Sequence, residues 1–380
     1  MASLDTQELN RYARQIRLPQ VGEGGQAKLK ASSVLIVGAG GLGSPAAMYL
    51  AAAGVGRLGI ADSDRVDMTN LQRQLLYGTD DVGRAKAEAA AETLESLNQS
   101  VDIDLIADRV TSENALELVS RYDVVIDGTD NFPTRYLLSD ACVLTDTPLV
   151  YGSVDRFAGQ ASVFVANGGP CYRCLFPNPP EQGTVQNCAD AGVLGVLPGL
   201  IGTMQATEVL KLLLGVGEPL IGRLLMVDAL RMDFRRIEIE RDPSCPACGT
   251  REIQQLIDYD AFCGAPNNDM QDNEPISVVT PTELAAELEH PNAIALIDVR
   301  EPYEWRLGHI EGARLIPLST LEGAFDTIDP AADVVVYCHH GMRSEMAAYA
   351  LREAGIRRVR NLVGGIDRWS REVDPRIPRY

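Results

Sequence analysis

Three sets of residues in this 380-residue chain have types and spacings that can do chemistry. The first is a glycine pattern, Gly38, Gly40 and Gly43, directly after an apolar run. Glycines in such a turn let backbone N–H groups approach a polyphosphate at a helix N-terminus. Asp62, about twenty residues further on, can accept hydrogen bonds from ribose hydroxyls. The pattern predicts a nucleotide site, and by itself it favours an NAD-dependent dehydrogenase.

The segment after this acid adds charged and amide side chains. They lie in one turn-rich stretch, DSDRVDMTNLQRQ, and just beyond it: Asp62, Asp64, Asn70, Gln72, Arg73 and Lys86. Cations at Arg73 and Lys86 favour a triphosphate that is attacked at its α-phosphorus, because anionic oxygens crowd that transition state. As single residues they are also compatible with solvated or salt-bridged surface groups. Asp130, at the end of the apolar run in VVIDGTDN, is a candidate oxygen ligand for Mg²⁺.

The second set consists of two C-x-x-C pairs, Cys171 with Cys174 and Cys245 with Cys248. Four thiolates at this spacing suit a closed tetrahedral Zn²⁺ site. Such a site has no open coordination position, so its expected role is structural. A redox-active pair and a coincidence of spacing are the alternatives.

The third set is Cys338 and Arg343, spaced C-x4-R after the apolar run VVVY. The spacing predicts a strand that ends in a short loop and continues as a helix from near Ser344. Backbone N–H groups of the loop, the helix N-terminus and Arg343 would all favour a thiolate and an attached persulfide. Cysteine phosphatases use the longer C-x5-R loop, so the shorter spacing favours sulfur transfer. His339 and His340 are expected only to line the loop.

Three further cysteines differ from one another. Cys188 lies in a Pro- and Gly-rich segment without periodicity, PNPPEQGTVQNCADAG, which predicts a loop over the site. It is either a second catalytic thiol or an incidental exposed one. Cys142 shares a predicted helix face with apolar residues and is expected in the core. Cys263 falls in a segment without a predicted role.

Composition limits the classes of function. The net charge of −19 excludes broad binding to nucleic acid or to an anionic membrane, although a local basic pocket for one nucleotide remains compatible. Residues 192–215 are apolar, but Thr203, Glu208 and Lys211 interrupt them, which favours a buried helix over a membrane span. The first residues lack the character of a signal or transit peptide. A cytoplasmic, reducing location is therefore expected.

The elements that must position these residues alternate along the chain. Strands are expected over 33–37, 57–64 and 122–131, with helices over 44–53 and 83–98 between them, which predicts a parallel, doubly wound sheet. Antiparallel strands follow over 149–154 and 159–166. The expected fold class is α/β: a Rossmann-like mixed sheet with a second, smaller α/β domain. The expected boundaries are residues 1–250, a linker over 251–275, and 276–380.

The motifs of the first domain resemble those of the MoeB/ThiF family, the bacterial relatives of ubiquitin-activating enzymes. NRYARQI, GAGGLGS, DxDxVxxxNLQRQ, GxxKA and DGTDN occur in the family's order over about residues 5–250. The resemblance implies ATP as the cofactor with Mg²⁺, and a site that includes Gly41, Asp62, Asn70, Arg73, Gln74, Lys86, Asp130 and Asn131. It also implies a homodimer in which Arg14 enters the neighbouring subunit's site, and it assigns Zn²⁺ to the two cysteine pairs.

Residues 276–380 resemble the rhodanese (sulfurtransferase) family, through LIDVREPYEWRLGHIEGARLIP, VVVYCHHGMRS and LVGGIDRW. Asp298 and Arg300 match the family's supporting residues. Together the two resemblances imply that ATP adenylates the C-terminal Gly-Gly carboxylate of a ubiquitin-like sulfur carrier of the MoaD/ThiS type. A Cys338 persulfide, supplied by thiosulfate or a cysteine desulfurase, then forms a thiocarboxylate for molybdopterin, thiamine or related cofactor synthesis. The alternatives are a nicotinamide-dependent oxidoreductase and an adapter with a binding-only rhodanese unit.

Overall fold

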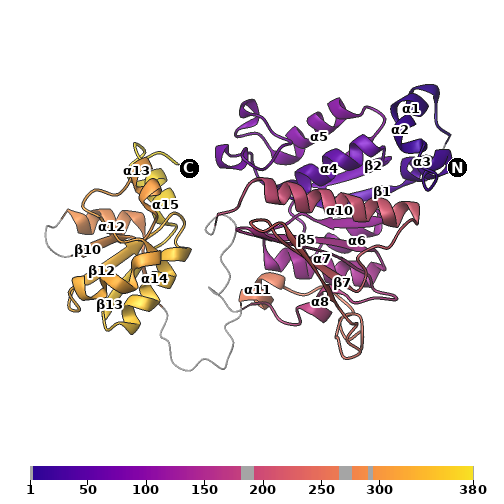
Figure 1. Ribbon diagram of the computed structural model, residues 1–380. Coiled ribbons are helices and arrows are strands. Elements are labelled where there is room, and N and C mark those ends of the chain that lie inside the picture. Colours follow the sequence, from indigo (N-terminus) through magenta and orange to yellow (C-terminus); the bar gives the residue numbers. More distant parts are fainter. Residues whose placement is uncertain (1–2, 181–191, 265–275, 290–293, 380) are drawn as a thin grey trace. The chain divides into compact units, whose positions relative to one another are not determined.

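The computed structural model describes residues 3–180, 192–264, 276–289 and 294–379 (Figure 1). The chain divides into two compact units, Met1–Ala265 and Pro266–Tyr380. Residues 251–264 of the expected linker therefore belong to the first unit. Their only regular element is a short helix, and a six-residue helix leaves no periodic signal in a sequence.

A mixed sheet forms the centre of the first unit. Its order is β3-β2-β1-β4-β5-β6-β7-β8, and the strands from β3 to β5 are parallel while β5 to β8 pair antiparallel. The bounds are β1 Ser33–Val37, β2 Arg57–Ala61, β3 Asp102–Ile106, β4 Val124–Asp127, β5 Leu149–Asp155, β6 Ala158–Phe164, β7 Arg223–Asp228 and β8 Asp233–Glu238. The expected mixed sheet, with a parallel and an antiparallel half, is confirmed.

Helices cover both faces of this sheet (Figure 1). Alternation along β1 explains why: Val34 and Ile36 pack with helices α4, α5 and α10, whereas Leu35 and Val37 pack with α6 and α7. The helices of this unit are α1 Thr6–Arg11, α2 Ala13–Ile16, α3 Gly22–Ala31, α4 Gly43–Ala53, α5 Lys86–Leu97, α6 Ala115–Ser120, α7 Phe132–Thr145, α8 Tyr172–Leu175, α10 Val196–Leu214 and α11 Tyr259–Gly264. Single 3₁₀ turns span Met68–Asn70 and Thr79–Asp81.

Helix α10 is the apolar segment whose composition resembles that of a membrane span. It packs on α4 and on strands β5 and β6, and Gln205 donates hydrogen bonds to the backbone oxygens of Asp127 and Val150, at 2.7 and 3.1 Å. Its buried apolar side chains therefore pack against the sheet and α4. Among the helices in the described part of the chain, none has the length and apolarity needed to cross a membrane.

The second unit is built on a parallel sheet of order β11-β10-β12-β13-β9. The side chains of β12 alternate, so Val334, Val336 and Cys338 pack with α14 while Val335 and Tyr337 pack with α12 and α15. The elements are β9 Ser277–Val279, α12 Pro281–Leu288, β10 Ile294–Asp298, α13 Pro302–Leu307, β11 Arg314–Leu315, 3₁₀ turns Leu318–Thr320 and Glu322–Thr327, β12 Asp333–Tyr337, α14 Met342–Glu353, β13 Arg358–Leu362 and α15 Gly365–Glu372.

A buried ion pair lies at the end of β10. Arg300 donates from Nε to Asp298 at 2.9 Å and from Nη2 at 2.5 Å, and both side chains are fully buried. The same Nη2 donates to the backbone oxygen of Gly308 at 2.8 Å. This pair fixes the loop between β10 and α13, in agreement with the supporting role expected for the two residues.

We expect Arg300→Leu to lower the free energy of unfolding of the second unit by about 3–5 kcal/mol, because it leaves the Asp298 carboxylate buried without its counter-ion. Both tryptophans of the chain, Trp305 and Trp369, lie in this unit, so tryptophan fluorescence in urea reports its unfolding within the full chain. Arg306→Leu is the matched control, because that side chain is exposed and its loss should change stability little. Equal midpoints for the two variants would contradict the prediction.

Candidate functional sites

The glycine turn joins β1 to α4 with its backbone packed against the end of β4. Gly38 has φ +90°, and a Cβ there would lie 2.7 Å from the backbone oxygen of Gly128. A Cβ at Gly43 would lie 1.9 Å from the oxygen of Gly38. These two glycines are therefore required by the fold. Gly40 and Gly41 have more room, and their nearest neighbours are the side chains of Gln74 and Pro198, with Arg73 also near Gly41.

The acids after β2 lie beside this turn. Asp62 accepts hydrogen bonds from the backbone N–H groups of Ala39 and Asp64, each at 2.9 Å. Burial raises the pKa of Asp62 above its ordinary value, although the charge of Lys86 opposes the shift. Lys86 is buried at the start of α5, and its Nζ lies 3.0 Å from the exposed carboxylate of Asp64. The structure thus brings the predicted acid, the predicted cation and the glycine turn together.

The NLQRQ segment lies on the other side of the turn. Asn70 ends a 3₁₀ turn and accepts a hydrogen bond from the N–H of Asp67, and Arg73 donates to the backbone oxygen of Thr69 at 3.0 Å. Gln74 is buried, and its Oε1 has no hydrogen-bond partner in the described structure. The Nε2 of the same amide is the nearest neighbour of Gly40, and because an unpaired buried acceptor is costly, the Oε1 indicates a position that a ligand donor can fill.

The end of β4 carries the remaining predicted residues of this site. Asp130 is exposed, and Asn131 accepts a hydrogen bond from the N–H of Thr134 at 3.0 Å as the N-cap of α7. Behind them, Asp127 and Arg135 form a buried pair 3.7 Å apart, which spacing in the sequence did not reveal. Arg14 lies exposed on α2. Its predicted insertion into a neighbouring subunit concerns a second copy of the chain.

The two C-x-x-C pairs come together although 74 residues separate them. Their Sγ–Sγ distances are 3.9 Å for Cys171–Cys174, 3.6 Å for Cys171–Cys245 and 3.4 Å for Cys174–Cys248, and all four sulfurs lie within 4.8 Å of one another. Thiolates about 2.3 Å from a tetrahedral Zn²⁺ lie about 3.8 Å apart, so this geometry fits the metal. The backbone N–H of Asp242 donates to Cys174 Sγ at 3.4 Å. The residues therefore suit a closed, four-thiolate centre.

Cys338 lies at the base of the loop between β12 and α14, fully buried. Its Sγ accepts hydrogen bonds from the backbone N–H of Gly341 at 3.1 Å and from Ser344 Oγ at 3.4 Å. Gly341 has φ +107° and is the N-cap of α14, so the loop and the helix start both face the sulfur. Asn361 Nδ2 donates to the Gly341 oxygen at 3.0 Å and holds the loop from β13.

Arg343 forms an ion pair with a residue that the spacing did not single out. Both of its terminal nitrogens donate to Glu304, each at 2.7 Å, and both side chains are nearly buried. Burial would raise the pKa of Glu304, but the hydrogen bonds and the charge of Arg343 outweigh it, and the pKa lies below its ordinary value. The guanidinium charge is therefore balanced by a carboxylate, and the pair ties α14 to α13.

The rest of the loop is neutral or tightly packed. Burial and the neighbouring His340 lower the pKa of His339 to about 4, so its imidazole is uncharged near neutral pH. Gly365, in the LVGGIDRW motif, has φ +57°, and a Cβ there would lie 2.4 Å from the backbone oxygens of Cys338 and His339. The close approach of the Cys338 loop, which is distant in the sequence, therefore explains why position 365 is a glycine.

The remaining cysteines separate into two groups. Cys142 is buried in the core on α7, as expected, and Cys263 is half-buried on α11. Cys188 lies outside the described residues. Glu304 and Asn361 carry no local sequence signal, because their partners Arg343 and Gly341 lie 39 and 20 residues away. Asp127 and Arg135 are only eight residues apart, but no motif marks their pairing.

Two protein-family models match the chain. The ThiF family model matches residues 12–247, and the model of the rhodanese-like domain matches residues 280–372. The first match contains the glycine turn, the Asp62–Lys86 cluster, the Cys171–Cys174 pair and Cys245, and it ends one residue before Cys248. The second contains Cys338 and its loop.

Similar curated proteins extend over the same two units. The "Probable adenylyltransferase/sulfurtransferase MoeZ" of Mycobacterium tuberculosis is 44% identical over 100% of this chain and 97% of its own length. The pig (Sus scrofa) protein named "Adenylyltransferase and sulfurtransferase MOCS3" is also 44% identical, over 100% of this chain and 89% of its own. The "Sulfur carrier protein adenylyltransferase" of Thermus thermophilus is 54% identical over 68% of this chain and 97% of its own.

Among solved structures, that of Escherichia coli MccB with "MccA-N7isoASN" superimposes with a TM-score of 0.57 at 23% identity. It covers 65% of this chain and 75% of that one, and at this identity it supports the fold alone. The family models and the full-length relatives lead to one assignment. The chain belongs to the ThiF family and carries a rhodanese-like domain at its C-terminal end.

Proposed function

We propose that this enzyme adenylates the C-terminal glycine carboxylate of a ubiquitin-like sulfur carrier and then converts it to a thiocarboxylate. The observation that carries the proposal is the presence in one chain of the ThiF-type nucleotide turn and a rhodanese-type loop that retains its cysteine, with Gly341 N–H donating to Cys338 Sγ at 3.1 Å. Relatives named adenylyltransferase and sulfurtransferase cover the whole chain, which supports the same combination. Molybdopterin, thiamine or related cofactor synthesis is the proposed context.

In the first half-reaction the carrier carboxylate attacks the α-phosphorus of ATP and pyrophosphate leaves. The glycine turn and the N-terminus of α4 would bind the phosphates, and Asp62 the ribose. Lys86 and Arg73 would offset the charge that develops on the phosphoryl oxygens. Gly40, Gly41, Asn70, Gln74 and Asn131 would complete the site, and Asp130 and Asp64 offer oxygen ligands for Mg²⁺.

A second copy of the chain is part of this proposal. Arg14 is exposed on a four-residue helix near the start of the chain, away from any role in the core. We propose that it enters the nucleotide site of a partner in a homodimer and adds a further cation there.

In the second half-reaction the terminal sulfur of a Cys338 persulfide attacks the carbonyl carbon of the acyl-adenylate, and AMP leaves. The product is an acyl disulfide on Cys338. A thiolate then attacks Cys338 Sγ, the S–S bond breaks, and the carrier leaves as its thiocarboxylate. The resulting disulfide takes two electrons from an external dithiol. Cys188 is the proposed attacking thiol within the chain. The Gly341 N–H and the N-terminus of α14 are proposed to favour the anionic persulfide, and Arg343, whose charge Glu304 balances, is proposed to fix the loop around it.

The four-cysteine cluster is proposed to hold Zn²⁺ through Cys171, Cys174, Cys245 and Cys248. A closed thiolate site provides structural cross-linking rather than chemistry. It would join the α8 segment to the segment that follows β8.

We expect ATP–pyrophosphate exchange that depends on a Gly-Gly-tailed carrier, and Lys86→Ala should lower it about a hundredfold by removing a cation from the transition state. Isotope exchange into ATP measures the effect, and Lys28→Ala, which removes an exposed lysine, is the control. Carrier-independent NADH turnover without exchange would contradict the proposed reaction.

If Cys338 carries the sulfur, its removal should stop the second half-reaction and leave the first unchanged. Cys338→Ala should abolish sulfur transfer from thiosulfate to cyanide and thiocarboxylate formation, while carrier-dependent exchange continues. Mass spectrometry of the carrier detects the thiocarboxylate, which is about 16 Da heavier than the carboxylate because sulfur replaces one oxygen. Cys263→Ala is the matched cysteine control. Thiocarboxylate formation that persists without Cys338 would move the sulfur carrier to another residue.

The low pKa of His339 predicts a flat pH response. The imidazole gains a proton only as the pH falls toward its pKa of about 4, well below the ordinary value of 6.5, so its charge is constant from about pH 6 to 8. His339→Gln should therefore leave the pH dependence of thiosulfate–cyanide sulfur transfer unchanged over that interval. A change in the sulfur-transfer rate with a midpoint near pH 6.5, present in the wild-type enzyme and absent from the variant, would contradict this prediction.

A further inference from the structure

The residues after the second cysteine pair return to the first unit and are held there by a buried carboxylate. Tyr259, at the start of α11, donates from its hydroxyl to Asp140 on α7 at 2.6 Å. Arg173 on α8 donates to the same carboxylate from Nε and Nη2, each at 2.8 Å. Tyr259 and Arg173 are each 4% exposed and Asp140 is fully buried, so α11 closes a saturated polar network.

An aromatic contact reinforces the network one turn further along α11. The ring of Phe262 meets that of Tyr136 edge-on, with centroids 5.2 Å apart. The Arg173 guanidinium lies 4.8 Å from the centre of each of these rings. Arg173 stands between Cys171 and Cys174 in the sequence, so α11 packs against the segment that carries the first cysteine pair.

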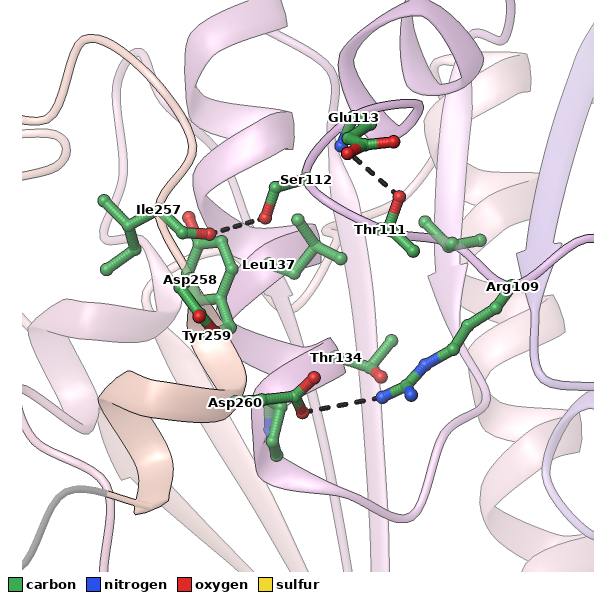
Figure 2. A pocket seen from close by; sticks show the side chains of 12 residues that line it. Arg109, Thr111, Ser112, Glu113, Thr134, Leu137, Ile257, Asp258, Tyr259 and Asp260 are labelled. Atoms are coloured by element: carbon green, nitrogen blue, oxygen red, sulfur yellow. Dashed lines mark hydrogen bonds and ion pairs between the residues drawn. The ribbon is translucent and has the colours of Figure 1, made fainter.

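The outer side of α11 makes weaker contacts. Ser112 Oγ donates to the backbone oxygen of Ile257 at 2.5 Å, and Arg109 and Asp260 form an exposed ion pair 3.5 Å apart (Figure 2). A cavity of about 410 Å³ lies among these residues, Thr134 and Leu137. It is open, and Arg109 and Asp260 form an ion pair among the residues that line it. Helix α11 is therefore held chiefly from its buried side, by Tyr259 and Phe262. The residues before it have contacts of their own: Arg251 donates to Asn167 Oδ1 at 3.1 Å, and Ile253 packs against the cysteine cluster.

Helix α11 is too short to be stable by itself, since isolated helices below about 12 residues are marginal in water. Its order comes from the contacts with α7 and α8. It is also the last element of the first unit before residues 265–275, which join the two units. We propose that α11 is the anchor of the sulfurtransferase unit, and that Tyr259 and Phe262 are positioning residues for sulfur transfer; this rests on the proposed function.

The anchor shortens the connection between the two half-sites. With α11 in place, eleven residues (265–275) separate it from Ile276, whereas release of the segment after Ile253, which packs on the cysteine cluster, gives a connection of 22 residues (254–275). Effective concentration falls roughly as the −3/2 power of the connecting length, so this doubling lowers the encounter rate of Cys338 with the adenylate about threefold. The chemistry at either site is left unchanged.

The test compares three rates in full-length enzyme that carries Tyr259→Ala and Phe262→Ala. The first is a single turnover of thiocarboxylate formation with preformed Cys338 persulfide, ATP and a Gly-Gly-tailed carrier. The other two are carrier-dependent ATP–pyrophosphate exchange and thiosulfate–cyanide sulfur transfer. We expect the first rate to fall about threefold and the other two to change by less than about 1.5-fold. Ile257→Ala, on the same segment with an exposed side chain, is the control and should change none of them.

A second variant tests the mechanism without touching the network. Insertion of fifteen Gly and Ser residues after Ala265 lengthens the connection while α11 stays packed, and it should lower the single-turnover rate by a similar factor. Tyr259→Phe keeps the ring and loses only the hydroxyl bond, so it should restore most of the rate. Hydrogen exchange should rise over residues 254–264 in the double variant and not in the insertion variant.

Three results would overturn the inference. An unchanged single-turnover rate in both the double and the insertion variant would show that the anchored length does not matter. A parallel fall in pyrophosphate exchange would show that α11 supports the adenylating site itself. If the wild-type enzyme forms no thiocarboxylate at all, the proposed function fails, and the role of the anchor fails with it.

Discussion

The close approach of three backbone segments at Gly38, Gly43 and Gly128 is the constraint on which the nucleotide end depends. A Cβ at Gly43 would lie 1.9 Å from the Gly38 oxygen, and one at Gly38 would lie 2.7 Å from the Gly128 oxygen. This contact seats the turn after β1 against the end of β4, next to the point where Asp62 receives the N–H of Ala39. The parallel order of the sheet then brings the ends of β1, β2 and β4 to one edge.

The sulfurtransferase unit uses the same physical device for a different atom. Cys338 ends a buried parallel strand, and α14 begins four residues later with a glycine N-cap. Again a glycine from elsewhere permits the approach, because a Cβ at Gly365 would lie 2.4 Å from the Cys338 oxygen. A helix N-terminus beside a strand end is a ready site for an anion. The two units differ in the group at this position: the proposed ligand of the first unit is a polyphosphate, and the second unit places the Cys338 sulfur there.

How far the sequence predicts this molecule depends on how local each signal is. The glycine turn, the C-x-x-C pairs and the C-x4-R loop have short, fixed spacings, and the structure forms compact clusters at all three. The alternation of apolar segments likewise predicts the mixed sheet. In contrast, the pairing of Glu304 with Arg343 spans 39 residues, and Asp140 joins Tyr259 across 119. No periodicity marks such contacts, because each member looks like an ordinary charged or aromatic residue until the fold brings them together.

Helix α11 shows the same limit at the level of a domain boundary. Residues 251–264 lack apolar periodicity and are polar enough to suggest a linker, yet Ile253 packs on the cysteine cluster and Tyr259 and Phe262 hold α11 to the first unit. Loss of these contacts is destabilising, because release of Tyr259 and Phe262 exposes the Asp140 carboxylate and the Arg173 guanidinium, which are otherwise buried and paired with each other. An acyl-adenylate is a mixed anhydride that water also attacks, so every delay in sulfur delivery costs ATP. An attachment point that is close to the second unit in the sequence limits that delay, which gives a physical reason for the chain to order this segment.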